Sequence, residues 1–443
     1  MRIRMYSAYF VGLIALALGV TAQAQVKIQH WQTSNGARVY FTEAPELPIV
    51  DAQVVFDAGS ARDGKLAGLA LMTNGMLSEG AGKWNADDIA ERFESVGAVY
   101  SNNSHRDMSV FSLRTLTDKP LMTRAVRTFA TVLAEPAFPT KAFEREKERL
   151  IVMLEKQKQD PGDIASRRFY SLVYSGHPYA TMPEGDIESI KALRVSNLRD
   201  FYNRYFVGRN ATVAIVGALS QSEAKALAED LVGNLKPGRM VSAIPRVMQV
   251  EKAVEASIEF PSSQSHILFG QVGLKRKDPD YFPLYLGNHI LGGSGLVSIL
   301  SDEIREKRGL SYSSYSYFSP MRDRGPFIMG LQTRNDQVEE ALAVMKTTLK
   351  SFVDNGPGKE QLEAAKKNLT GGFALQVASN KSIVGYLAMI GFYQMPLDYL
   401  DTFIDNINRV SAESIKKAFQ QRVLLDQLVT VVVGGSSEKE SSR

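Results

Sequence analysis

Three side chains in the second half of the chain could together bind the backbone of a peptide. Arg305, Arg308 and Tyr312 follow the glycine-rich stretch Gly292-Gly293-Ser294-Gly295. A guanidinium group and a phenol held side by side can bind a peptide carbonyl or a carboxylate through charge-assisted hydrogen bonds. The alternative is that the arginines only offset the dipole at the C-terminal end of a helix that precedes an ordinary strand.

The elements that must position these side chains can be predicted from the neighbouring residues. Residues 296–308 are expected to form a helix that begins at the glycine loop. Gly309 is expected to end it, because glycine adopts positive φ without steric cost. The aromatic run 312–318 then predicts a strand, towards which Arg305 and Arg308 can project. Helical spacing predicts one buried face, made by Leu296, Ile299, Leu300, Glu303 and Ile304.

The spacing of the histidines, glycines and serines elsewhere in the chain gives no recognised motif for a metal site, a phosphate site or a nucleophilic serine. No histidine has a second histidine three to five residues away, and neither H-E-x-x-H nor H-x-x-E-H occurs. A zinc site would therefore need distant histidines that converge in space. The glycine loop has neither the spacing of a phosphate-binding loop nor a G-x-S-x-G element for a nucleophilic serine. The histidines are His30, His105, His177, His266 and His289.

Length and charge limit the classes of protein to which the chain can belong. With 443 residues it is too long for one hydrophobic core, and two or three folding units are expected. The net charge of +4 and the absence of a basic cluster with interleaved aromatic residues give no support for nucleic-acid binding. Because the sequence has no cysteine, disulfides, thiolate catalysis and a lipid-bearing thiol are excluded.

The N-terminus has the three parts of a secretory signal peptide. Arg2 and Arg4 form a positive region, residues 10–20 form an apolar segment too short to span a bilayer, and Ala22-Gln23-Ala24 forms a cleavage site. We expect removal of residues 1–24 by cleavage after Ala24 and export of the mature chain to the periplasm, without a membrane attachment. The alternative is a retained membrane anchor.

The rest of the chain has the pattern of two similar α+β halves. The buried, glycine-ended strand expected at 211–217 recurs near the C-terminus at 428–435. This repetition indicates the duplication of one α+β unit. The expected boundaries are 25–235 for the first half, 236–250 for a linker, 251–435 for the second half and 436–443 for a disordered tail.

The stretch around Arg305 resembles a signature motif of the pitrilysin-like inverzincin peptidases, an M16-type family of zinc enzymes. In that family the second half carries L-G-G-G-x-x-S-x-L-x-x-E-I-R-E-K-R-G-L-x-Y, and residues 291–312 match it almost completely. The resemblance covers nearly the whole mature chain. It implies an α+β fold in which two homologous LuxS/metallopeptidase-like halves form a clamshell around a peptide-sized chamber.

The resemblance also assigns roles to individual residues. In the family, an arginine and a tyrosine seven residues apart bind the substrate backbone and stabilise the oxyanion of the tetrahedral intermediate. Arg305 and Tyr312 match these positions, and Arg308, Gly292 and Gly293 are expected to contact the substrate as well. The segment 102–111 matches the strand that aligns substrate by β-augmentation, although strands are expected only on either side of a polar segment at 101–107.

The first signature motif of the family is degenerate in this chain. Where the family has G-L-A-H-x-x-E-H, the positions of the two histidines and the general-base glutamate hold Leu71, Gly75 and Asn74. Glu155, among apolar neighbours, matches the family's distal glutamate ligand but has lost its companions. Leucine and glycine cannot bind zinc, and no base remains to deprotonate a water. No cofactor is therefore expected in this chain.

The resemblance finally implies a second chain. Some members of the family divide the active site between a zinc-bearing subunit and a subunit with the arginine and tyrosine. We therefore expect a non-zinc subunit of a periplasmic heterodimeric peptidase, inactive alone, that supplies Arg305 and Tyr312 to a partner in which zinc is expected. The alternative is a catalytically inactive scaffold or peptide-binding protein of the same fold.

Overall fold

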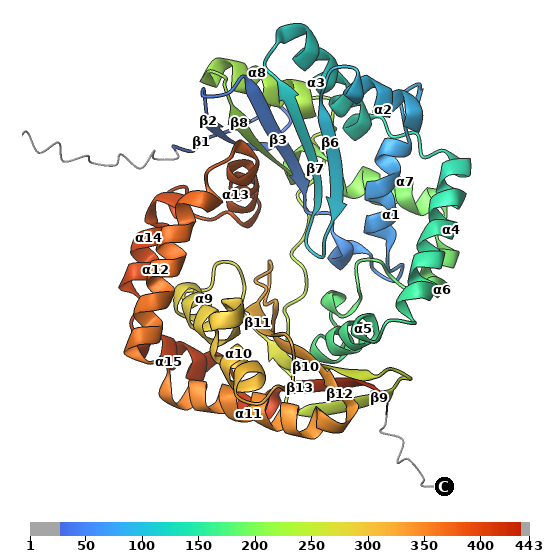
Figure 1. The fold of residues 1–443 in the computed structure, drawn as a ribbon. Coiled ribbons are helices and arrows are strands. Elements are labelled where there is room, and N and C mark those ends of the chain that lie inside the picture. Colours follow the sequence, from blue (N-terminus) through green and yellow to red (C-terminus); the bar gives the residue numbers. More distant parts are fainter. Residues whose placement is uncertain (1–26, 436–443) are drawn as a thin grey trace, which may run out of the picture.

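The computed structural model describes residues 27–435. The expected signal peptide, with its cleavage site after Ala24, and the expected tail at 436–443 lie outside the described residues. Within the described range, no helix is both long enough and apolar enough to cross a membrane. Two mixed sheets, each packed by helices, make up the fold (Figure 1). The prediction of an α+β fold with two halves of this kind is confirmed.

The first sheet has six strands in the order β1-β2-β8-β3-β7-β6. Its neighbouring strands are antiparallel except for the parallel pair β2 and β8. The buried strand expected at 211–217 is β8, in the interior of this sheet. The bounds are β1 (Gln29–Gln32), β2 (Arg38–Glu43), β3 (Ile49–Phe56), β6 (Val99–Ser104), β7 (Ser109–Leu116) and β8 (Ala211–Gly217), with β4 (Gly80–Ala81) and β5 (Trp84–Asn85) as a separate pair.

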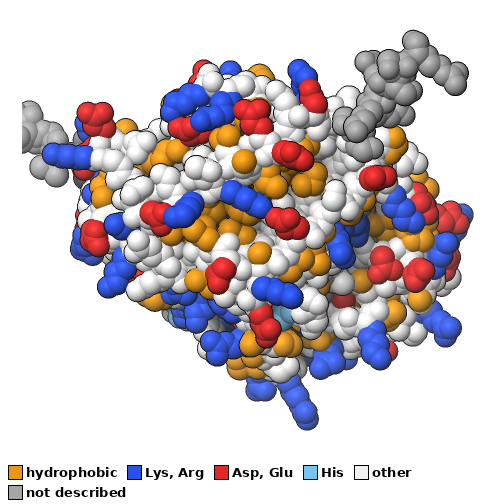
Figure 2. Space-filling view, turned by 90° about the horizontal axis from the view of Figure 1, so that it is seen from below, with side chains coloured by type: hydrophobic (Ala, Val, Ile, Leu, Met, Phe, Trp, Pro, Cys, Tyr) orange, Lys and Arg blue, Asp and Glu red, His pale blue; other side chains and the backbone are white. Residues whose placement is uncertain are grey.

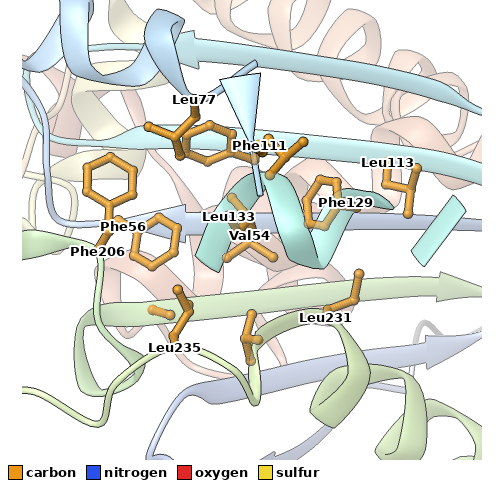
Figure 3. Packing of buried hydrophobic residues seen from close by; sticks show 14 of the residues in the cluster. Val54, Phe56, Leu77, Phe111, Leu113, Phe129, Leu133, Phe206, Leu231 and Leu235 are labelled. Carbon is orange, nitrogen blue, oxygen red and sulfur yellow. The ribbon is translucent and has the colours of Figure 1, made fainter. Parts of the chain in front are cut away.

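Helices from the first half cover one face of this sheet. Phe56, Phe111 and Phe206 pack together under them, and Leu133 and Leu231 reach the same core from two of the helices (Figure 3). The first half contains, besides α5 (Pro161–Val173), the helices α1 (Leu69–Met76), α2 (Ala86–Glu94), α3 (Lys119–Ala134), α4 (Thr140–Gln157), α6 (Ile187–Ala192), α7 (Val195–Tyr205) and α8 (Gln221–Val232), of which α1, α2, α3 and α8 contact the strands and α4 and α7 pack on α1.

The second sheet has five strands in the order β11-β12-β10-β13-β9, with β13 and β9 parallel. The strands are β9 (Val254–Glu259), β10 (Gln264–Val272), β11 (Ser314–Phe318), β12 (Pro326–Arg334) and β13 (Val429–Gly434). The helices of this half are α9 (Tyr281–Asn288), α10 (Ile299–Ser301), α11 (Val338–Asn355), α12 (Lys359–Gln376), α14 (Tyr399–Arg409) and α15 (Ala412–Arg422). The linker 236–250 has no helix or strand.

One helix from each half packs on the sheet of the other half. Helix α5 (Pro161–Val173), from the first half, packs on β13 and β10. Helix α13 (Asn380–Tyr393), from the second half, packs on β8 and β3 (Figure 1). Phe169 of α5 is fully buried in this contact. The two halves are therefore interlocked across the space between the sheets.

Three expectations about individual elements were wrong. No continuous helix runs over 296–308, because Ser298 is extended and its Oγ accepts from the Ser301 N–H (3.2 Å), so α10 begins only at Ile299. Leu296 consequently lies outside the buried face and is 66% exposed. Residues 101–104 belong to β6 and pair with β7, although the segment is polar.

The outer surface carries both signs of charge. In the view from below, lysine and arginine side chains alternate with aspartate and glutamate, and small apolar areas lie between them (Figure 2). This face has no extended basic area of the kind that binds a nucleic-acid backbone.

Candidate active site and interdomain chamber

The glycine-rich turn packs closely against the strand that follows it. Gly292 lies in the π-helical turn η5 (His289–Gly293), where a Cβ would come within 2.4 Å of Ser316 Oγ and 2.6 Å of Leu300 Cδ1. Asn288 Nδ2 donates to the Ser316 carbonyl (3.0 Å), and Ser316 Oγ donates to Asn288 Oδ1 (2.8 Å). Gly292 is thus buried by a close approach to β11, whereas Gly293 is exposed and lines a cavity.

Arg305 and Tyr312 are brought together as expected from their spacing. The π-helical turn η7 (Asp302–Glu306) carries Arg305, and Gly309 follows it with φ of +61°. The N–H of Gly309 donates to the Arg305 carbonyl (2.9 Å), so the turn closes at the predicted glycine. The chain then reverses, and the Arg305 guanidinium lies 5.2 Å from the centroid of the Tyr312 ring. This distance is within the range of a cation–π contact.

Tyr312 lies just before β11 rather than within it, and it is 85% exposed. The Arg305 side chain is 32% exposed, and its Nε is 3.5 Å from Glu306 Oε1. Both polar groups can therefore be reached from outside the fold. Such a pair can donate two hydrogen bonds to one oxygen atom of an extended peptide.

Arg308 is engaged differently from Arg305. Its Nη1 donates to the carbonyl and to a carboxylate oxygen of Glu303, each at 2.7 Å. Lys307 also pairs with Glu303, through Nζ at 2.6 Å. Together these cations hold the pKa of Glu303 below its usual value, chiefly through their hydrogen bonds to its carboxylate. Arg308 thus fixes the end of the turn, whereas the Arg305 guanidinium contacts Tyr312 and pairs with the neighbouring Glu306.

Two cavities share part of their walls, and the larger of them lies between the halves. The larger, of about 600 Å³, is lined from the first half by Leu71, His105 and Tyr170, among others, and from the second half by Met321 and Met389. The smaller, of about 390 Å³, lies beside β11 and includes Gly293 and His289. Both have Arg276, Ser319 and Pro320 in their walls. Arg305 and Tyr312 belong to neither wall.

The positions that correspond to a zinc site do not fit a metal ion. Leu71 presents an apolar side chain to the larger cavity. Asn74 Nδ2 donates to the Asn103 carbonyl of β6 (3.1 Å), and Asn102 Nδ2 donates to the Asn74 carbonyl (2.9 Å). Asn74 therefore ties α1 to the strand edge. Gly75 has no side chain to offer.

Glu155 is not in the apolar setting that its sequence neighbours suggested. Its side chain is 54% exposed and pairs with Lys158 at 3.3 Å, because α4 turns this face to solvent. Among residues 27–435 there is no group of three or more histidine, cysteine, aspartate or glutamate side chains that could hold a metal ion. The donor set needed for zinc is therefore absent from the described chain.

A buried polar network joins the halves and was not recognised in the sequence. Asp107 accepts hydrogen bonds from the hydroxyls of Tyr179 (2.5 Å) and Tyr393 (3.1 Å) and from the backbone N–H of Arg322 (2.6 Å). Burial raises the pKa of Asp107, and these three donors oppose that rise. Because its members are far apart in sequence and belong to both halves, no local pattern could have identified the network.

Comparison with known proteins places both halves in one family. Residues 38–184 match "Insulinase (Peptidase family M16)", and residues 192–369 match "Peptidase M16 inactive domain". A crystal structure of a "peptidase M16 inactive domain" from Pseudomonas fluorescens is 39% identical and superimposes with a TM-score of 0.90, over 93% of this chain and 98% of that one.

Curated relatives carry two kinds of name. An "uncharacterized zinc protease YmxG" of Bacillus subtilis is 21% identical over 91% of this chain and 98% of its own length. A "non-peptidase homolog YmxG" of Helicobacter pylori is 24% identical over 96% of this chain and 99% of its own length.

Proposed function

The chain belongs to peptidase family M16, and from this premise we propose that it is the non-zinc subunit of a heterodimeric peptidase. In this proposal a zinc-bearing partner of the same family cleaves peptides, and the chain supplies Arg305 and Tyr312 to the scissile carbonyl. The observation that carries the proposal is the intact, exposed contact of Arg305 with Tyr312 in a chain whose zinc positions are Leu71, Asn74 and Gly75.

The chemistry of the pair supports this role. As a peptide bond is attacked, negative charge develops on its carbonyl oxygen. A guanidinium and a phenol can stabilise that charge by hydrogen bonds, and neither group needs to bind a metal ion to do so. Tyr312 is largely exposed, so its hydroxyl would lose water only when a substrate or a partner covers it. An incomplete site of this kind explains why the chain would need a second subunit.

The N-terminal sequence supports a location for this assembly. We propose that the chain is exported and that the assembly works in the periplasm after cleavage behind Ala24. N-terminal sequencing of the protein purified from the periplasmic fraction should begin at Gln25. A mature protein that still begins at Met1 would argue against export through this signal.

The experiment that tests the function uses two chains. The protein would be co-expressed with a zinc-motif M16 chain from the same genome, and peptide cleavage would be measured for each chain alone and for the mixture. We expect zinc in the partner and cleavage that requires both chains and is reduced in Arg305→Ala. Equal activity of the partner with and without this chain would refute the proposal.

A second candidate function is peptide binding without catalysis. It is favoured by the curated relative named a non-peptidase homolog and by the position of Arg305 and Tyr312 outside both cavity walls. If this function holds, the purified chain should bind peptides, and Arg305→Ala should leave the activity of any associated peptidase unchanged.

A further inference from the structure

Four charged residues line the larger cavity, and two of them are already engaged. Asp107 accepts from Tyr179, Tyr393 and the Arg322 backbone, as described above. The Arg106 guanidinium lies 3.7 Å from the centroid of Tyr170, and its Nε donates to the Tyr179 carbonyl (3.3 Å). Burial lowers the pKa of His105, which favours its neutral form. The remaining charged residues of the cavity wall are Glu184 and Arg276.

Arg276 extends from the loop between β10 and α9, in the wall shared by the two cavities. Its Nε is buried and donates no hydrogen bond, and no carboxylate of the described chain forms an ion pair with it. Its guanidinium lies 5.4 Å from the centroid of the Tyr393 ring. A half-buried guanidinium of this kind is free to bind an anion that enters the cavity.

Glu184 extends from the loop between η3 (Pro178–Ala180) and α6, in the other half of the chain. Its Oε2 is buried and accepts no hydrogen bond within the described residues. The nearby Arg167 donates to the Gly185 carbonyl and to Gln157 Oε1, both at 2.7 Å. Burial, the charge of Asp160 and the charge of Glu184 raise the pKa of Asp163, so Glu184 lies within electrostatic reach of a second carboxylate.

Apolar side chains make up much of the rest of the cavity wall. Side chains from both halves contribute to it: Val55, Leu71, Met108, Val110, Met321 and Met389. The cavity volume of about 600 Å³ lies within the range of about 300–1,000 Å³ that is usual for small-ligand sites. Ser104 Oγ, at the end of β6, is a third buried polar atom in this wall without a hydrogen bond.

We propose that the larger cavity binds a short peptide with free ends, whose α-amino group pairs with Glu184 and whose α-carboxylate pairs with Arg276. The two unpaired groups have opposite charge and come from opposite halves, which matches a zwitterion that bridges the halves. The apolar wall receives the side chains of the peptide. The choice of a peptide rests on the proposed function, whereas the site itself is separate from Arg305 and Tyr312.

The test measures binding to the purified chain without any partner subunit. A panel of tetrapeptides built from alanine, leucine and phenylalanine is made in free, N-acetylated, C-amidated and doubly blocked forms, and affinities are measured by calorimetry. We expect each blocked end to weaken binding to the wild-type chain by about 10- to 100-fold, the usual effect of one lost hydrogen bond to a charged group.

Variants assign each end of the peptide to its residue. Arg276→Gln should weaken binding of the free peptide about as much as amidation does, and amidation should then have no further effect. Glu184→Gln should weaken binding of the free peptide about as much as N-acetylation does, and acetylation should then have no further effect. Arg276→Lys keeps a positive charge and should retain part of the preference for the free carboxylate.

Matched controls are Arg334→Gln and Glu360→Gln, both at exposed positions outside the cavity wall. The proposal is overturned if amidation weakens binding equally in the wild type and in Arg276→Gln, or if no tetrapeptide binds at about 1 mM. Either result can occur while cleavage by the two-chain assembly still depends on Arg305, so the failure of this site and the failure of the proposed function are distinguishable.

Discussion

The guanidinium of Arg305 lies over the ring of Tyr312, 5.2 Å from its centroid, and no carboxylate other than that of Glu306 pairs with Arg305 among the described residues. Arg308, three residues further on, is held by Glu303 instead. The two arginines, three residues apart, therefore have different partners. One fixes the turn, and the other is available to a ligand.

This difference predicts different effects of the two arginines on catalysis. In the assembled two-chain peptidase, Arg305→Ala or Tyr312→Phe should lower kcat by about 10²- to 10³-fold, the usual effect of losing one group that stabilises an oxyanion. Thermal unfolding should hardly change, because Tyr312 is largely exposed. Arg308→Ala is the matched control and should lower the melting temperature more than it lowers kcat. Equal losses of kcat in all three variants would contradict the assigned roles.

The metal content of the chain follows from its side chains. The protein purified alone should contain much less than one zinc ion per chain, because the described residues offer no cluster of three donors. The protein would be incubated with zinc, unbound zinc would be removed by dialysis, and the zinc that remains would be measured by mass spectrometry. A zinc-motif M16 chain is the positive control. Stoichiometric zinc that survives dialysis would show that distant histidines converge after all.

The sequence predicted the elements whose signals are local. Strands β8 and β13 are apolar runs that end in glycine, and Gly309 ends its turn with the positive φ expected of it. Helix α13 is apolar on most sides, because it packs on the first sheet and on its own half, so no clear amphipathic period in its sequence indicates the sheet that it covers. Leu296 was misplaced because the extended conformation of Ser298 interrupts the helical spacing.

The candidate site was also only partly predictable, because only some of its contacts lie between residues that are close in sequence. Arg305 and Tyr312 are close in sequence, and their contact depends on one turn. Glu184 and Arg276 share a cavity only because the two halves face each other. Nothing in the sequence near either residue indicates the other, and nothing near α5 or α13 indicates which sheet it will cover.

The exchange of helices predicts that the halves stay together without the linker. A specific protease site inserted after Met240, in a segment with no helix or strand, should allow complete cleavage. The two fragments should still elute as one particle in size-exclusion chromatography, because α5 and α13 bury apolar side chains on the opposite sheet. Separation into two folded fragments without denaturant would contradict the interlocked arrangement.

Two glycines of α13 should respond in opposite ways to the same substitution. A Cβ at Gly391 would lie 2.5 Å from a ring carbon of Tyr40 and 2.6 Å from the methyl group of Thr212. Gly391→Ala should therefore destabilise the protein by about 1–3 kcal/mol through overpacking. Gly385→Ala meets nothing within 4 Å and should stabilise it by about 0.5–1 kcal/mol. Urea unfolding of both variants measures the difference, and equal effects would contradict the close approach of α13 to the sheet.

Asp63 predicts a dependence of stability on pH. Its carboxylate accepts from the N–H groups of Gly68 and Ala70, each at 2.8 Å, at the start of α1. Burial outweighs these hydrogen bonds and raises the pKa of Asp63 to about 7. Because the folded state holds this proton more tightly than the unfolded state, the contribution of Asp63 to stability falls as pH rises from about 4 to about 7.

Asp63→Asn removes the titrating group and keeps one side-chain oxygen as an acceptor. The free energy of unfolding of the wild type, minus that of the variant, should therefore decrease between pH 4 and pH 7, by at most about 1.4 kcal/mol per pH unit. Urea titrations of both proteins across this range measure the difference and cancel the titration of groups that the two proteins share. A difference that stays constant, or that rises with pH, would mean that the two N–H groups, and not burial, determine the pKa of Asp63.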